Sequence, residues 1–203
     1  MERLAELYPD AKCSLDWTTP LDLLVATVLS AQCTDARVNQ VTPGLFARYR
    51  TAAEYAAAAP DEMEQAIRSV NFFRNKARAL IGIGRALEER HAGEVPGKMD
   101  ALLALPGVGR KTANLVRGVV FGATEGVVVD THVTRISRRL KLTRHEDPDR
   151  IERDLLPLIA PEGRIVFTDR VIAHGRSVCD ARRPLCASCS LSDLCPTYAR
   201  AAA

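Results

Sequence analysis

Residues 105–113 read Leu105-Pro106-Gly107-Val108-Gly109-Arg110-Lys111-Thr112-Ala113. Apolar residues recur at helical spacing on both sides, so we expect one helix over Met99–Leu105 and another over Lys111–Phe121. Glycine lacks a Cβ, which allows a sharp turn and a close approach of the backbone to a ligand. The N-terminus of the second helix can then bind an anion such as a DNA phosphate. The candidate DNA-binding residues of the turn are Gly107, Val108, Gly109 and Arg110. A helical hairpin whose glycines serve packing alone is the alternative.

Lys111 also admits a catalytic interpretation. The positive dipole end of a helix and partial burial both favour the neutral amine, which can attack an electrophilic carbon and form a Schiff base. A solvated surface lysine is the alternative. Asp130 precedes another amphipathic segment, where an aspartate is commonly the N-cap of a helix. An ionised aspartate at that place can also face a developing cation, and the two roles are compatible.

Four of the six cysteines gather near the C-terminus with the spacing Cys-x6-Cys-x2-Cys-x5-Cys. They are Cys179, Cys186, Cys189 and Cys195. The N-terminus has no apolar signal core, so a reduced cytoplasm and metal ligation are favoured over disulfides. Zinc sites with two knuckles need two Cys-x2-Cys hooks, and only one is present, so an iron–sulfur cluster is favoured over zinc.

Arg182 and Arg183 lie between the first two ligands and are candidate phosphate contacts, with simple solvation as the alternative.

The rest of the chain predicts an all-α protein. Thr19 with Pro20 begins a helix, Thr34 begins another that we expect to end at Pro43, and residues 74–90 carry one apolar face. Further helices are expected to begin near Thr131, at Asp147-Pro148 and near Glu162. The strand-like run over residues 127–129 is too short and isolated to found a sheet.

Composition places the chain among globular proteins. It has 203 residues, of which 47% are hydrophobic and 26% charged, and the net charge is +3. A chain of this length can bury a hydrophobic core. No apolar run reaches the ~20 residues that a membrane span requires. The mild positive charge is compatible with a polyanionic partner. We expect a cytoplasmic monomer that does not enter membranes.

With these residues assembled, the sequence resembles the endonuclease III family of DNA glycosylases. The match includes residues 29–35, 73–77, 105–113 and 129–133 and the four C-terminal cysteines, in the order of the family. The resemblance implies the helix-hairpin-helix glycosylase fold. A six-helix barrel domain over residues 14–123 packs on a [4Fe–4S] domain built from residues 1–13 and 124–203, and the active-site cleft lies between them.

The resemblance also implies a bifunctional DNA glycosylase and abasic-site lyase that excises oxidised pyrimidines from duplex DNA in base excision repair. Its DNA partner would contain damaged bases or abasic sites. The family nucleophile matches Lys111 and the catalytic aspartate matches Asp130. The lysine attacks C1′ of an extruded nucleotide, and β-elimination through a Schiff base then breaks the strand. A [4Fe–4S] cluster would be held by the four cysteines.

Three further residues match DNA-contact positions of the family. Gln32 matches the residue that fills the gap left by the extruded base. Phe72 occupies the position of the wedge that presses on the opposite strand. Asn71 stands where the family usually has glycine, and we expect it to adopt a positive φ, since asparagine tolerates that conformation better than most residues.

Other function classes remain open at this point. The adenine glycosylase branch shares the hairpin and the cluster, but typically has serine where this chain has Lys111 and carries an added C-terminal domain. A catalytically silent iron–sulfur DNA-binding protein is a second alternative, which the presence of both Lys111 and Asp130 disfavours. A structural zinc protein is the third.

Overall fold

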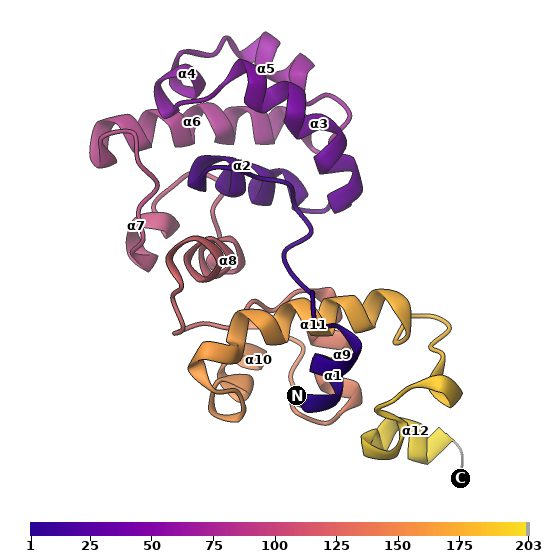
Figure 1. Cartoon of the computed structure of the whole chain (residues 1–203). Coiled ribbons are helices and arrows are strands. Elements are labelled where there is room, and N and C mark those ends of the chain that lie inside the picture. Colours follow the sequence, from indigo (N-terminus) through magenta and orange to yellow (C-terminus); the bar gives the residue numbers. More distant parts are fainter. Residues whose placement is uncertain (202–203) are drawn as a thin grey trace. The chain divides into compact units, whose positions relative to one another are not determined.

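The computed structural model describes residues 1–201, and this part of the chain contains helices and loops without a strand. The all-α prediction is therefore confirmed. The chain divides into two compact units (Figure 1). Residues 14–121 form one, called the hairpin unit here. Residues 1–13 and the chain from residue 122 onward form the other, the cysteine unit. No helix in the described part is both long and apolar enough to cross a bilayer.

The hairpin unit is built from helices that pack on α2 and α6. Its elements are α2 (Pro20–Ser30), α3 (Asp35–Arg48), α4 (Ala52–Ala57), α5 (Pro60–Ala66), α6 (Phe73–His91), α7 (Met99–Leu103) and α8 (Arg110–Phe121). Helix α6 packs against α4 and α5, whereas α2 packs against α3 and α8. Almost every side chain of α2 is buried, which makes it the central helix of the unit.

Local capping signals explain where several of these helices begin. The side chain of Thr19 accepts a hydrogen bond from the backbone of Asp22, whose carboxylate accepts one from Thr19 N at 2.9 Å. Thr51 and Glu54 form the same reciprocal box at the start of α4. Such boxes satisfy backbone donors that the helix itself leaves unpaired. These starts agree with the sequence pattern.

The expected end of α3 at Pro43 is wrong, because the helix continues through Pro43 to Arg48. A proline inside a helix removes one backbone hydrogen bond and usually breaks the helix. Here residues after Pro43 are buried in the core: Leu45 is 2% exposed, and Tyr49, just beyond the helix, is 5% exposed. Burial of these side chains outweighs the local cost.

The cysteine unit brings both ends of the chain together. Its helices are α1 (Glu2–Leu7), α9 (Thr131–Arg139), α10 (Pro148–Leu155), α11 (Arg164–Ser177) and α12 (Pro196–Ala201), with short 3₁₀ turns between them. One apolar core joins Leu4 near the N-terminus, Ile151 of α10, Val171 of α11 and Leu191 near the C-terminus. On the surface, Arg3 pairs with Asp193 through both of its terminal nitrogens.

The apolar run at residues 127–129 is buried without forming a strand. Its backbone pairs with side chains instead: Val127 N donates to Glu152 Oε1 at 3.2 Å, and Thr168 Oγ1 donates to Val128 O at 3.1 Å. These bonds fix the extended segment that leads directly to Asp130.

Candidate nucleic-acid interface and metal centre

The glycine turn joins α7 to α8 within the hairpin unit. Leu105 and Val108 are 3% and 7% exposed and anchor the turn in the core. Gly107 has φ +73°, and a Cβ there would lie 3.0 Å from the Cβ of Ala79, so both backbone conformation and packing require glycine. A Cβ on Gly109 would meet nothing within 4 Å. Packing inside the protein therefore explains Gly107 but leaves the space above Gly109 open for a ligand.

Helix α8 begins at Arg110, directly after this open position. The first N–H groups of any α-helix lack partners within the helix and carry the positive end of its dipole. Lys111 lies in this first turn and is exposed. The positive end of the α8 dipole thus lies beside a solvent-accessible amine.

Asp130 is the N-cap of α9 in the cysteine unit. Its Oδ1 accepts a hydrogen bond from Val133 N at 2.8 Å, and the side chain is half-buried. The N-cap interpretation from the sequence is therefore confirmed. His132 follows Asp130 by two residues, and its Nδ1 lies 3.0 Å from Arg135 Nη2. Burial lowers the pKa of His132, although the charge of Asp130 opposes this shift.

Two non-glycine residues of the hairpin unit adopt left-handed backbone conformations at the candidate DNA-contact loops. Gln32 has φ +53° and Phe72 has φ +57°. The side chain of Phe72 projects into solvent, with the residue 60% exposed. A positive φ on a bulky residue is a strained conformation that occurs most often at functional sites.

The prediction that Asn71 has a positive φ is wrong, because the left-handed residue is Phe72. The side chain of Asn71 instead donates a hydrogen bond from Nδ2 to the backbone oxygen of Gln32 at 2.7 Å. A residue 39 positions away supplies the acceptor. Local conformational preference could not reveal that partner.

Lys76 is a buried lysine for which the sequence pattern predicted no role. It is 6% exposed, and its Nζ donates to Leu29 O at 2.7 Å and to Ala31 O at 2.6 Å. Burial lowers its pKa. A signal existed, since Lys76 stands one helical turn before Leu80 on the apolar face of α6. Both carbonyls belong to the end of α2, so Lys76 caps that helix.

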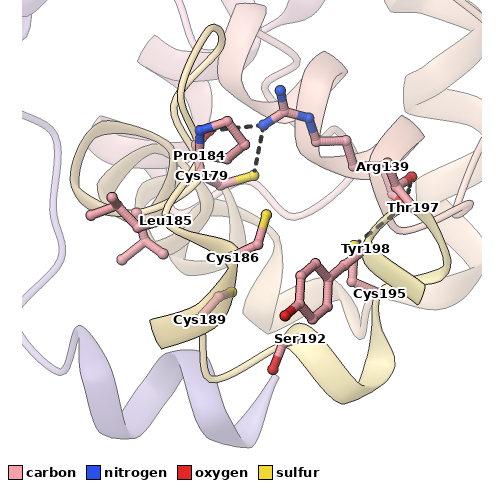
Figure 2. A pocket seen from close by; sticks show the side chains of 11 residues that line it. Arg139, Cys179, Pro184, Leu185, Cys186, Cys189, Ser192, Cys195, Thr197 and Tyr198 are labelled. Atoms are coloured by element: carbon pink, nitrogen blue, oxygen red, sulfur yellow. Dashed lines mark hydrogen bonds between the residues drawn. The ribbon is translucent and has the colours of Figure 1, made fainter. Parts of the chain in front are cut away.

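The four C-terminal cysteines line a single cavity of about 190 Å³ in the cysteine unit (Figure 2). All four are free thiols and none is fully exposed. The other lining residues include Pro184, Leu185 and Tyr198, which surround the sulfur atoms with apolar surface. A water molecule occupies about 30 Å³ of liquid, so this space accommodates a group much larger than one ion.

Hydrogen-bond donors are directed at these sulfurs. Arg139 Nη1 donates to Cys179 Sγ at 3.1 Å, and Leu191 N donates to Cys189 Sγ at 3.4 Å. His174 Nε2 lies 3.5 Å from Cys189 Sγ. Such donors stabilise thiolate ligands. Burial raises the pKa of Cys189, and the hydrogen bond from Leu191 N opposes this shift.

No three His, Cys, Asp or Glu side chains of residues 1–201 converge as ligands of a single metal ion. The four cysteines instead line one cavity (Figure 2), in which the Cys195 thiol donates to Arg139 O at 3.8 Å. Four soft sulfur ligands around a largely apolar cavity larger than one ion match the donor set of a polynuclear iron–sulfur cluster. The residues present therefore fit such a group.

Arg139 also fixes the loop that carries Arg182 and Arg183. Besides Cys179 Sγ, its guanidinium donates to Asp180 O at 2.7 Å and to Ala181 O at 3.0 Å. The carboxylate of Asp180 accepts from the backbone N–H groups of Arg183 and Arg182, and these bonds lower its pKa. The loop is thereby ordered while the two arginine side chains remain exposed.

Known proteins match this chain over most of its length. A sequence model of the HhH-GPD superfamily base excision DNA repair proteins matches residues 25–161. Endonuclease III of Synechocystis is 55% identical, covering 96% of this chain and 89% of that protein. Endonuclease III of Bacillus subtilis is 42% identical with the same coverage.

Solved structures give the same result. A trapped covalent intermediate of endonuclease III with DNA superposes with a TM-score of 0.94 at 44% identity, covering 100% of this chain and 95% of that one. A thermostable thymine-DNA glycosylase shares the fold, with a TM-score of 0.88 at 20% identity, 98% of this chain and 94% of that one.

A helical fold with a glycine hairpin, matched by these relatives, defines a base excision DNA repair protein of the helix-hairpin-helix class. Within that class, the chain belongs to the endonuclease III family. It is accordingly a DNA glycosylase with abasic-site lyase activity.

Proposed function

We propose that this enzyme excises oxidised pyrimidines from duplex DNA in the bacterial cytoplasm, with Lys111 as nucleophile and Asp130 as its catalytic partner. The observation that carries the proposal is the hairpin: Gly109 leaves open space at the start of α8, and the exposed Lys111 lies in the adjoining turn. A relative of 44% identity has been trapped as a covalent intermediate with DNA. That trapping supports an amine nucleophile here.

Lys111 has a rival among the lysines. Burial lowers the pKa of Lys76, and a lowered pKa is a common property of catalytic amines. However, Lys76 Nζ is turned inward and donates to two backbone carbonyls. It cannot reach a sugar without breaking both hydrogen bonds and uncapping α2. Geometry therefore favours Lys111.

The proposed reaction has two stages. Neutral Lys111 attacks C1′ of the extruded nucleotide, the glycosidic C1′–N bond breaks, and the base leaves with the bonding electrons and a proton. Ionised Asp130 stabilises positive charge that develops on the sugar. The C1′–O4′ bond then breaks, O4′ takes up a proton from solvent, and the nitrogen lone pair forms the C1′=N bond of a protonated Schiff base. Loss of a C2′ proton follows, and the C3′–O bond breaks with the phosphate as leaving group. This β-elimination cleaves the strand on the 3′ side.

DNA contacts are assigned to both units. Gly107, Val108, Gly109 and Arg110 would bind a phosphate at the start of α8. Gln32 would fill the gap in the duplex and Phe72 would press on the opposite strand. Arg182 and Arg183 would neutralise further phosphates. We also assign residues 14–123 to the barrel domain of the family and residues 1–13 and 124–203 to its cluster domain.

The cofactor we propose is a [4Fe–4S] cluster held by Cys179, Cys186, Cys189 and Cys195. When bound, it would cross-link the C-terminal segment and hold the loop of Arg182 in place. The cavity volume and the donors at Cys179 and Cys189 support this assignment. Purified protein should be yellow-brown with about four irons per chain. Colourless protein with stoichiometric zinc would contradict the assignment.

Borohydride trapping on matched duplexes tests the substrate class. The duplexes carry thymine glycol, an abasic site, adenine opposite a mismatch, or no lesion. We expect covalent adducts with thymine glycol and the abasic site alone. Trapping or excision that is selective for mispaired adenine would support the adenine glycosylase branch instead. Binding of all duplexes without any cleavage would indicate a silent DNA-binding protein.

A further inference from the structure

Two strained loops of the hairpin unit lie next to each other. Gln32 follows the end of α2, Phe72 precedes α6, and both have a positive φ. Residues with a Cβ adopt this conformation only where the surrounding structure imposes it. The exposed ring of Phe72 gains no burial in return. The backbone oxygen of Phe72 begins α6 by accepting a hydrogen bond from Lys76 N at 3.1 Å, so its backbone has a structural role while its ring stays exposed.

Three hydrogen bonds connect the two segments. Asn71 Nδ2 donates to Gln32 O at 2.7 Å, while Lys76 Nζ donates to Leu29 O and Ala31 O. The first bond joins the residue before Phe72 to the strained residue Gln32 itself. The other two fix the end of α2, from which the Gln32 loop departs.

These bonds have different consequences for stability. Lys76 is buried and caps α2, so its loss would disturb folding. Asn71 is exposed, and an exposed amide bond adds little to the stability of a fold. The Asn71 bond nevertheless joins the two loops directly. Its effect should therefore lie in where Gln32 and Phe72 are held.

We propose that Asn71 is a positioning residue that locks the Gln32 loop to the Phe72 loop, so that both side chains enter the duplex as one preorganised unit. The inference rests on the proposed function, which assigns Gln32 to the gap and Phe72 to the opposite strand. A glycine at this position would have no side chain to form this bond, so the lock depends on the side chain of Asn71.

The lock should matter most where a base pair has to be opened. Extruding a base costs unpairing and unstacking energy, whereas an abasic sugar has no base to unstack. Preorganised side chains reduce the ordering cost at the moment of insertion. Asn71 should therefore contribute more to base excision than to cleavage at a preformed abasic site.

The test compares Asn71→Gly with Asn75→Ala in the full-length, cluster-loaded enzyme. Asn75 is also exposed and follows closely in the chain, and its side chain bonds to Arg78 rather than to the Gln32 loop. Single-turnover rates are measured on duplexes with thymine glycol and with a preformed abasic site. A fluorescent base analogue beside the lesion reports unstacking independently of the chemistry.

We expect Asn71→Gly to slow excision and unstacking roughly three- to tenfold, the effect of one lost hydrogen bond, with a smaller loss at the abasic site. Asn75→Ala should match the wild type. In enzyme that already carries Gln32→Ala, Asn71→Gly should lower the excision rate little further, because the side chain that Asn71 positions is absent.

The inference would be overturned if Asn71→Gly cleaved both substrates at the wild-type rate. It would also be overturned if the variant lost the same rate on both substrates and unfolded at a lower temperature. A third contradicting result is that the rate losses of Asn71→Gly and Gln32→Ala are fully additive. Failure of the wild type to cleave either duplex would instead refute the proposed function, and the inference with it. An active wild type with an unaffected variant refutes the inference alone.

Discussion

Asp130 combines a structural and a proposed catalytic role in one carboxylate. Its Oδ1 accepts the bond that begins α9. Aspartate and asparagine cap helices about equally well. The charge can therefore be removed while the cap is kept, which separates the two roles experimentally.

Asp130→Asn should fold normally but slow base release on the order of 100-fold or more, since it removes a charge proposed to stabilise the transition state. Asp147→Asn is the matched control, because Asp147 Oδ1 caps α10 by accepting from Arg150 N at 3.0 Å. Thermal unfolding and single-turnover excision measure the two roles. Equal activity of the two variants, or unfolding of Asp130→Asn alone, would contradict the catalytic assignment.

Asp169 of α11 supplies a pH-dependent test of stability. Burial raises its pKa from 3.8 to about 6. The folded state then binds the proton more tightly than the unfolded state. This contribution to stability is fully present below the unfolded pKa and is lost as the pH rises through the folded pKa.

Asp169→Asn stays neutral at every pH, so it should unfold at a higher temperature than the wild type at about pH 8 and at a similar temperature at about pH 3. The difference should develop between these limits. Asp10→Asn, at an exposed aspartate, is the control. A difference that does not change with pH would show that Asp169 is not buried as described.

At the scale of elements, local signals predicted helix starts well. Thr19, Thr34 and Asp147 all cap the helices expected from the sequence, because a cap depends on residues within one turn. The continuation of α3 through Pro43 could not be predicted, since burial of Leu45 and Tyr49 is a tertiary effect.

The same reasoning separates the site residues that were found from those that were missed. The spacing of the four cysteines and of the glycines in the turn indicates their chemistry directly from the sequence. Arg139 acts on Cys179 from 40 residues away, and Asn71 acts on Gln32 from 39 residues away. No spacing pattern marks such partners, so their roles emerge only from the folded structure.

The loop of Arg182 and Arg183 carries a prediction at this scale. Because Arg139 and Asp180 order the loop, each arginine can neutralise a phosphate at low entropic cost. Arg182→Ala with Arg183→Ala should flatten the slope of log affinity against log salt by roughly two at most, since each phosphate contact contributes about 0.9.

The loss should be similar for damaged and undamaged duplexes, because phosphate contacts carry no base information. Arg144→Ala with Arg150→Ala changes the net charge equally at two other exposed arginines of the same unit. An unchanged slope in the Arg182 and Arg183 variant would show that the loop does not contact DNA.

At the scale of the whole molecule, the proposed chemistry draws on both compact units. Lys111 comes from the hairpin unit, whereas Asp130 and the cysteine cavity come from the other. The apolar core of the cysteine unit contains Leu4 and Leu191, so both ends of the chain contribute to the frame of the cavity. The proposed mechanism depends above all on which amine forms the bond to DNA.

Mass spectrometry of the borohydride-trapped adduct identifies that amine directly. The wild-type enzyme is trapped on a thymine glycol duplex, digested with nuclease and protease, and sequenced for the lysine that carries the sugar remnant. The account predicts the modification on Lys111, and its loss in Lys111→Gln but not in Lys98→Gln, a change at another exposed lysine of the hairpin unit. Modification of Lys76, or undiminished trapping by Lys111→Gln, would contradict it.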